Sequence, residues 1–183
     1  VSLLCSLDPN CHAETIHYGD EEVPENKNLF GLFNKENMKV AVAVARYFKV
    51  TMSGIVKALK NYEPKNMRGE MKLTKKGNKI ILDAYNANPS SMKATLESFA
   101  ALADPRPKWI ILGDMKELGA HSSKAHKQIL SDISFFCFSN VILIGESFCE
   151  AHENLKRYAC FKNKEDFLES PFAASIRNAV VLI

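Results

Sequence analysis

One polar loop of this chain carries side chains that could bind a ligand, and it follows a short apolar run. The sequence ILDAYNANPSSM, residues 81–92, places an acid, a phenol and two amides at Asp83, Tyr85, Asn86 and Asn88. A carboxylate could fix a cation or a ribose, and a carboxamide both donates and accepts hydrogen bonds. The simpler alternative is a turn, in which Asp83 caps its own loop and the asparagines adopt left-handed backbone. A single turn does not require two amides followed by a proline, so we expect a binding loop here.

Two further loops place polar residues after an apolar run. In GDMKELGAHSS, residues 113–123, Asp114 and Glu117 are a carboxylate pair that could supply general bases or metal ligands, or form a solvated turn. The third loop is GES, residues 145–147. Each loop leads into an expected helix, whose first N–H groups and dipole favour an anion. His126 lies inside one of these helices, where a lone histidine is usually structural or exposed.

The common motifs for nucleotide binding and hydrolysis are missing from the printed sequence. It contains no G-x-G-x-x-G, no G-x-x-x-x-G-K-[ST], no nucleophile elbow and no H-E-x-x-H. The residues alone therefore indicate an α/β domain with a polar, anion-friendly rim and no complete catalytic set.

Alternating apolar runs and helical patterns position these loops. The run 69–83 is typical of a hairpin with its turn at Gly77 and Asn78. We then expect strands at 79–83, 108–113, 140–145, 158–161 and 179–183, with helices at 90–103, 121–136, 147–156 and 164–169. Ser90 and Ser91 are most simply caps of the first of these helices. Several strands are apolar throughout, which is typical of a parallel sheet covered on both faces. The pattern predicts a Rossmann-like, mostly parallel, doubly wound sheet.

The residue pattern in the first third of the chain predicts a separate helical unit. We expect a buried helix over 34–48 with Asn34 as its N-cap. A second short helix follows, with Thr51 or Ser53 as its cap, and Pro64 closes it. A weak alternation at 13–20 could be an edge strand. Residues 65–70 look like a hinge, so the expected domains are 1–64 and 65–183.

Composition narrows the class of protein. The 183 residues carry a net charge of only +3, which gives no reason to expect a nucleic-acid or membrane partner. No run is long enough to span a bilayer, and the apolar start lacks the basic residues of a signal peptide. Five cysteines without a C-x-x-C predict reduced thiols in a cytoplasmic protein, with Cys137 and Cys160 in the core. The chain lacks an initiator methionine and stops within a strand pattern, so we expect a fragment or a single domain.

Two long stretches resemble the Mur ligases. They are MRGEMKLTKKGNKIILDAYNANPSSMKATLESFAAL and ILGDMKELGAHSSKAH, and the GLFNKEN start of the expected helix at 34–48 is similar to the family's G-x-x-N-x-x-N. The resemblance covers residues 29–149 well and the tail weakly. It implies that residues up to about 64 end the family's central ATPase domain and that the remainder is most of its C-terminal domain.

The resemblance also implies an activity, ATP-dependent peptide-bond formation through an acyl phosphate. The D-x-Y-N-A-N-P-x-S-M run is similar to the members that join D-alanyl-D-alanine to UDP-N-acetylmuramoyl-tripeptide. By this resemblance ATP is held by Asn34, Asn37, Arg68, Asp83 and Tyr85, and the substrates by Asn86, Asn88, Ser91, Asp114 and Glu117. Arg68, Asp83 and Asn86 are the implied catalytic residues, with Arg68 reaching phosphate or ribose and Asp83 orienting Arg68 or touching the ribose.

The same resemblance places the Mg²⁺ ligands outside this chain and implies a monomer that is inactive alone. Two alternatives remain open at this point. One is another ligase of the same fold, such as one acting on folate or polyglutamate, against which the Y-N-A-N-P run argues. The other is a non-catalytic α/β binding module that retained the fold without the ATPase half.

Overall fold

The computed structural model describes residues 16–152 and 157–183 and divides the chain into two compact units. The smaller unit contains residues 16–27 and 33–62 of this described part, and the larger one contains residues 28–32 and 63–183. We describe each unit by itself.

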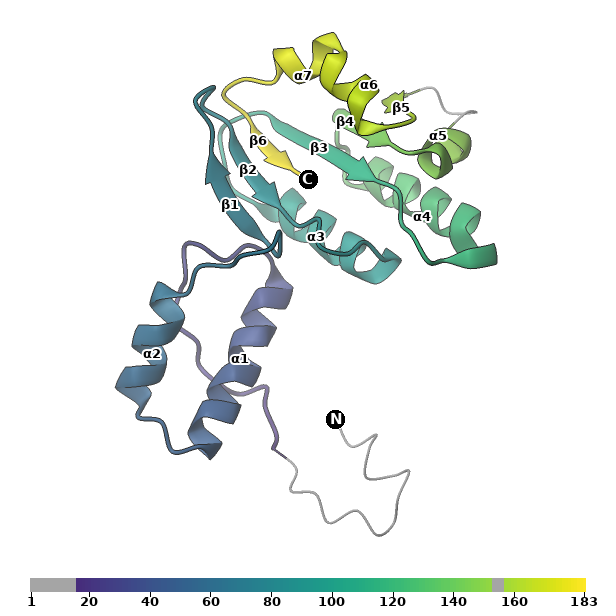
Figure 1. The fold of residues 1–183 in the computed structure, drawn as a ribbon. Helices are drawn as coiled ribbons and strands as arrows, with labels where there is room; N and C mark the ends of the chain where they lie inside the picture. The colour runs from purple at the N-terminus through teal and green to yellow at the C-terminus, as the bar shows by residue number, and fades with distance from the viewer. Residues whose placement is uncertain (1–15, 153–156) are drawn as a thin grey trace. The chain divides into compact units, whose positions relative to one another are not determined.

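The larger unit is built on a six-stranded sheet in the order β1-β2-β6-β3-β4-β5 (Figure 1). The strands are β1 (Glu70–Leu73), β2 (Lys79–Leu82), β3 (Lys108–Gly113), β4 (Asn140–Ile144), β5 (Ala159–Phe161) and β6 (Val180–Leu182). Only β1 pairs antiparallel, with β2; the other neighbours are parallel. Leu182 of β6 pairs with Ile81 on one side and Ile110 on the other. The predicted α/β fold class is confirmed.

Helices cover both faces of this sheet. They are α3 (Pro89–Ala101), α4 (Ser122–Phe135) and α5 (Glu146–His152), the short 3₁₀ turn η1 (Gly119–His121), and α6 (Lys164–Glu169) and α7 (Pro171–Ser175). Figure 1 shows α6 and α7 on the side of the sheet opposite to α3 and α4. Ile110 and Leu112 of β3 face the core beneath α3 and α4, whereas Ile111 between them joins the core beneath α6. The strands are apolar throughout because consecutive residues face two different cores.

The smaller unit consists of two helices and the segment that precedes them. They are α1 (Leu32–Tyr47) and α2 (Met52–Asn61), and the Thr51 side chain caps α2 by accepting from Gly54 N–H. Asn26 donates from Nδ2 to the carbonyls of Leu59 and Tyr62, which fixes the segment against the end of α2.

Several local predictions for these elements are wrong. Asn34 is not the N-cap of its helix, because α1 begins two residues earlier at Leu32. The edge strand expected at 13–20 is absent from residues 16–20, and the rest of that range lies outside the described residues. The helix expected at 147–156 begins one residue earlier, at Glu146, and the structure describes it as far as His152; residues 153–156 lie outside the described residues. Helix α7 was not predicted, since its five residues are too few to show a helical period.

The cysteine prediction also needs correction. Cys149 of α5 and Cys160 of β5 form a disulfide, with their Cα atoms 5.7 Å apart. Cys137 is exposed and not in the core, and Cys5 and Cys11 lie outside the described residues. Spacing along the chain could not reveal this pair, because the fold alone brings α5 beside β5. Among the helices that the structure describes, none is long and apolar enough to cross a membrane.

Candidate functional site

A small pocket lies at the carboxyl ends of β2, β3 and β6, where open α/β sheets bind ligands. Its volume is about 120 Å³. Its polar lining comes from Asp83, Asn86, Ser91 and Thr95, and Gly113 at the end of β3 borders it. The fold therefore brings the first two predicted loops to one edge of the sheet.

Asp83 is held at the rim of this pocket with part of its carboxylate still available. Its Oδ2 accepts a 2.6 Å hydrogen bond from Thr95 Oγ1 on α3, and its backbone N–H donates to the Ile183 carbonyl. Within residues 16–152 and 157–183, Asp83 Oδ1 accepts no hydrogen bond. Thr95, which the sequence did not single out, is therefore the residue that orients Asp83.

Arg68 is oriented by an aromatic ring and not by an acid. Its guanidinium carbon lies 3.7 Å from the centre of the Tyr85 ring, and Tyr85 N–H donates to the Met67 carbonyl. Both side chains are exposed. The structure shows no ion pair between Arg68 and Asp83 in the part of the chain that it describes, so the expected orientation of Arg68 by Asp83 is not present. A stacked guanidinium keeps its N–H groups for a ligand.

Asn88 and Ser91 form the N-terminal capping box of α3. Asn88 Oδ1 accepts from Ser91 N–H at 2.9 Å, and Ser91 Oγ accepts from Asn88 N–H at 3.3 Å. The expectation that Ser91 takes part in the cap is confirmed, but the N-cap residue is Asn88, and Ser90 lies within the first turn of α3. Asn86 differs, because it is exposed and takes no part in the cap.

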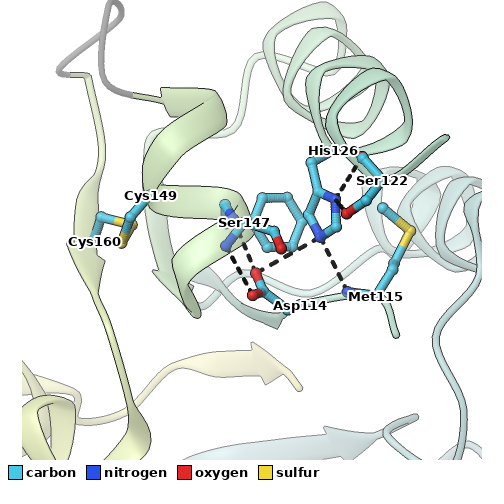
Figure 2. Close-up of polar contacts among 8 residues, drawn as sticks. Asp114, Met115, Ser122, His126, Ser147, Cys149 and Cys160 are labelled. Atoms are coloured by element: carbon cyan, nitrogen blue, oxygen red, sulfur yellow. Dashed lines mark hydrogen bonds and ion pairs between the residues drawn. A yellow bond between two sulfur atoms is a disulfide. The ribbon is translucent and has the colours of Figure 1, made fainter. Parts of the chain in front are cut away.

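The second loop holds Asp114 against α5 (Figure 2). Asp114 Oδ2 accepts from Ser147 N–H and Oδ1 from Phe148 N–H, each at 2.9 Å. Gly145 lies so close that a Cβ at this position would overlap the Asp114 carboxylate. The expectation that the GES loop offers free N–H groups to an anion is therefore wrong at Ser147 and Phe148, since an internal carboxylate occupies them.

His126 supports the next residue of the same loop. Its fully buried ring accepts Met115 N–H at Nε2, 3.1 Å away, and its Nδ1 donates to the Ser122 carbonyl at 2.8 Å. These two partners fix the neutral tautomer with the proton on Nδ1. The 3.6 Å approach of Nε2 to Asp114 Oδ1 is consequently a contact and not an ion pair. The structural interpretation of His126 is confirmed, and its polar partners were not predicted.

The remaining predicted residues, Glu117, Asn34 and Asn37, are not among the residues that line the pocket. Glu117 is exposed with a left-handed backbone, at φ 63°. No cluster of three potential metal ligands exists within the described ranges, so Asp114 and Glu117 are not part of one there. Asn34 is buried and Asn37 exposed on α1 of the smaller unit, three residues apart on one helix.

Comparison with known proteins identifies the family. A family model for the Mur ligase, glutamate ligase domain, matches residues 67–183. The UDP-N-acetylmuramoyl-tripeptide--D-alanyl-D-alanine ligase of Bacillus subtilis is 37% identical over 106 residues, which are 58% of this chain and 23% of that protein. This chain therefore spans about a quarter of the length of that curated relative.

Solved structures share the fold over most of the chain. A MurF structure from Acinetobacter baumannii is 25% identical with a TM-score of 0.68, covering 83% of this chain and 34% of that one. A MurF ligase from Thermotoga maritima, solved in complex with ADP, is 20% identical with a TM-score of 0.70 and covers 84% of this chain and 34% of its own. Because the family model matches more than half of its residues, this chain belongs to the Mur ligase family.

Proposed function

We propose that this chain is the C-terminal part of an ATP-dependent ligase that joins D-alanyl-D-alanine to UDP-N-acetylmuramoyl-tripeptide in peptidoglycan precursor synthesis. The observation that carries the proposal is the polar loop after β2, in which Asp83 and Asn86 line the pocket and Arg68 lies over the Tyr85 ring, in a chain that is similar to a curated ligase of this name. The enzyme would be a cytoplasmic monomer, and the chain would be inactive without its remaining domains. Residues 1–64 would end the ATPase domain, and residues 65–183 would form the C-terminal domain.

The rim suits charge neutralisation and positioning, which phosphoryl and acyl transfer require. The Arg68 guanidinium would bind phosphate oxygens or the ribose of ATP, with Tyr85 keeping it extended over the loop. Asp83 would accept from a ribose hydroxyl through the oxygen that Thr95 does not occupy. Asn34 and Asn37 would contact the adenine, since a carboxamide both donates and accepts.

The side of the site that takes the dipeptide is assigned to the loops after β2 and β3. Asn86 would hold the dipeptide, and the segment through Glu117 would border it. Asn88 and Ser91 would position the substrates indirectly, because they fix the start of α3 as its capping box. The described residues offer no metal-ligand cluster, so we assign no Mg²⁺ ligand to this chain.

The test uses the full-length protein that carries this chain. Incubation with ATP, Mg²⁺, UDP-N-acetylmuramoyl-tripeptide and D-alanyl-D-alanine should release phosphate only when both substrates are present. Arg68→Ala should reduce kcat/KM for ATP about tenfold or more, the cost of a lost charge-assisted hydrogen bond.

Arg157→Ala is the matched control, because this exposed arginine also lies over a tyrosine ring, at 5.5 Å from the centre of Tyr158, but outside the rim. It should leave the kinetics unchanged. Ligation of glutamate in place of D-alanyl-D-alanine would overturn the substrate assignment. Equal kinetics of Arg68→Ala and wild type would remove Arg68 from the site.

A further inference from the structure

The loop after β3 is anchored by two sets of hydrogen bonds that share no atoms, one at the partly buried Asp114 and one at the fully buried His126. Asp114 grips the start of α5 through two N–H groups, in a space that exists only because residue 145 is glycine. The backbone of Met115 is held from α4 by the ring of His126. Two consecutive residues are thus fixed by two different helices (Figure 2).

The anchoring has little freedom to shift. His126 is fully buried and meets the Phe148 ring edge-on, with centroids 4.5 Å apart, while the Met115 side chain is 3% exposed in the core. A buried imidazole must keep both hydrogen bonds, because an unpaired polar group in the interior costs about 1–3 kcal/mol. A simple apolar contact could hold the loop without this requirement, so the polar anchor fixes orientation as well as proximity.

The residues that follow the anchored pair Asp114 and Met115 are exposed. They are residues 116, 117 and 119, and Gly113, directly before the pair, borders the pocket. Each oxygen of Asp114 already accepts a hydrogen bond from a backbone N–H of α5. Asp114 is therefore placed to support the segment and not to bind a substrate directly.

We propose that Asp114, His126 and Gly145 are positioning residues that hold the segment 116–119 in place for the incoming dipeptide. This inference rests on the proposed function and replaces the predicted substrate contact of Asp114 with an indirect role. It adds Gly145 and His126, which act through Asp114 and Met115 respectively.

The decisive experiment compares Asp114→Asn with Gly145→Ala in the full-length protein. Asp114→Asn sets an amide N–H against a backbone N–H, and Gly145→Ala displaces the carboxylate without changing its chemistry. Each should lower kcat/KM for D-alanyl-D-alanine about tenfold or more, while KM for ATP stays within about twofold, because a small misplacement of a positioning segment is costly. The double variant should be no worse than the more affected single variant.

Additive losses, or a loss in Asp114→Asn with wild-type kinetics in Gly145→Ala, would overturn the proposal, since Asp114 would then act on the substrate itself. Gly77→Ala is the control for backbone strain. Gly145 and Gly77 both have a positive φ, of 130° and 77°, but a Cβ at Gly77 would meet no atom closer than 3.7 Å, and Gly77 lies in the turn between β1 and β2. It should leave the dipeptide kinetics unchanged.

His126 is tested by rescue. His126→Gln retains an acceptor that can reach Met115 N–H and should keep more of the dipeptide kcat/KM than His126→Phe, which fills the volume without accepting. Equal losses in both variants would contradict the hydrogen-bonded role. Amide exchange gives a separate readout: Ser147 and Phe148 should exchange faster in Asp114→Asn, and Met115 in His126→Phe.

The wild-type assay separates this inference from the proposed function. If the wild-type enzyme does not ligate D-alanyl-D-alanine, the proposed function fails before any variant is compared. If it does ligate and the variants show faster exchange with unchanged dipeptide kinetics, only the positioning role is overturned.

Discussion

Polar side chains of the same residue type have different roles at this edge of the sheet, because their hydrogen-bond partners differ. Asp83 and Asp114 both follow a parallel strand, yet Asp83 keeps one oxygen available whereas Asp114 gives both to α5. Asn86 is exposed, while Asn88 two residues later caps α3. Available groups on a fixed backbone are what a binding site needs, so Asp83 and Asn86 are the stronger candidates for direct contact.

The carboxylate of Asp104 allows a prediction of how the stability of the fold depends on pH. Asp104 accepts hydrogen bonds from the Arg106 guanidinium, which contribute most, and from the Arg106 backbone N–H, and together they lower the pKa of Asp104 from 3.8 to about 2. A lowered folded-state pKa stabilises the fold above pH 4, and this stabilisation is lost as the pH falls from about 4 to about 2. Since the pair lies near the surface, the contribution should be about 1 kcal/mol.

Urea unfolding of wild type and Asp104→Asn between pH 2 and pH 6 measures this contribution. The difference in the free energy of unfolding between wild type and Asp104→Asn should become smaller as the pH falls from about 4 to about 2. Glu165→Gln is the control, because Glu165 forms an exposed ion pair with Lys164 and its replacement should not affect the midpoint. A difference between wild type and Asp104→Asn that does not vary with pH would contradict the assignment.

Local side-chain roles were predictable from sequence only where the partner is a near neighbour in the chain. Ser91 as a cap follows from its position after Asn88 and Pro89. The partner of Asp114 lies 33 residues away on α5, and Asp83 is oriented by Thr95 from the opposite side of a turn. Those pairings depend on strand order, which periodicity does not contain.

At the scale of elements, α5 is a short helix held at several points along its length. Asp114 binds its first N–H groups, Cys149 joins it to β5, and His152 at its end accepts from the N–H groups of Arg157 and Tyr158. A helix of seven residues is not stable by itself, so these attachments hold it in place.

The disulfide should therefore contribute measurably to the stability of the fold. It closes a loop with a sequence separation of 11, for which chain entropy predicts about 3 kcal/mol. The double variant Cys149→Ser with Cys160→Ser should unfold at lower urea than oxidised wild type, and reductant should lower the wild-type midpoint but not that of the variant.

Thiol titration in denaturant checks the bond directly. Wild type should gain two titratable thiols on reduction relative to the unreduced sample. Cys137→Ser is the control, since this exposed thiol is outside the bond and its loss should leave the midpoint unchanged. An unreduced wild type with every cysteine reactive would contradict the disulfide.

The elements themselves were largely predictable because their signals are local. The apolar runs at 108–113 and 140–145 correspond to β3 and β4, and the helix at 164–169 has the predicted bounds. Where the prediction failed, the signal was short or absent, as for the five residues of α7. The start of α1 was missed because an asparagine inside the helix resembled a cap.

At the scale of the whole larger unit, β6 joins two parts of the sheet that are otherwise separate. It lies between β2 and β3, so the hairpin β1-β2 and the group β3-β4-β5 are connected only through the last strand of the sheet in chain order. Its residues Val180, Val181 and Leu182 are all buried. Its pairing with β2 spans roughly a hundred residues of the chain, and non-local contacts are slow to form, so we expect β6 to join the sheet late in folding.

Leu182→Ala should therefore destabilise the larger unit far more than the same change on the edge strand β1. Leu182 is 2% exposed and contacts the core from the centre of the sheet, so its truncation should cost about 2–5 kcal/mol. Leu73→Ala is the matched control, because Leu73 is 80% exposed and its truncation should stay within about 0.5 kcal/mol. Urea unfolding followed by circular dichroism measures both; equal midpoints for the two variants would mean that β6 does not hold the two parts of the sheet together.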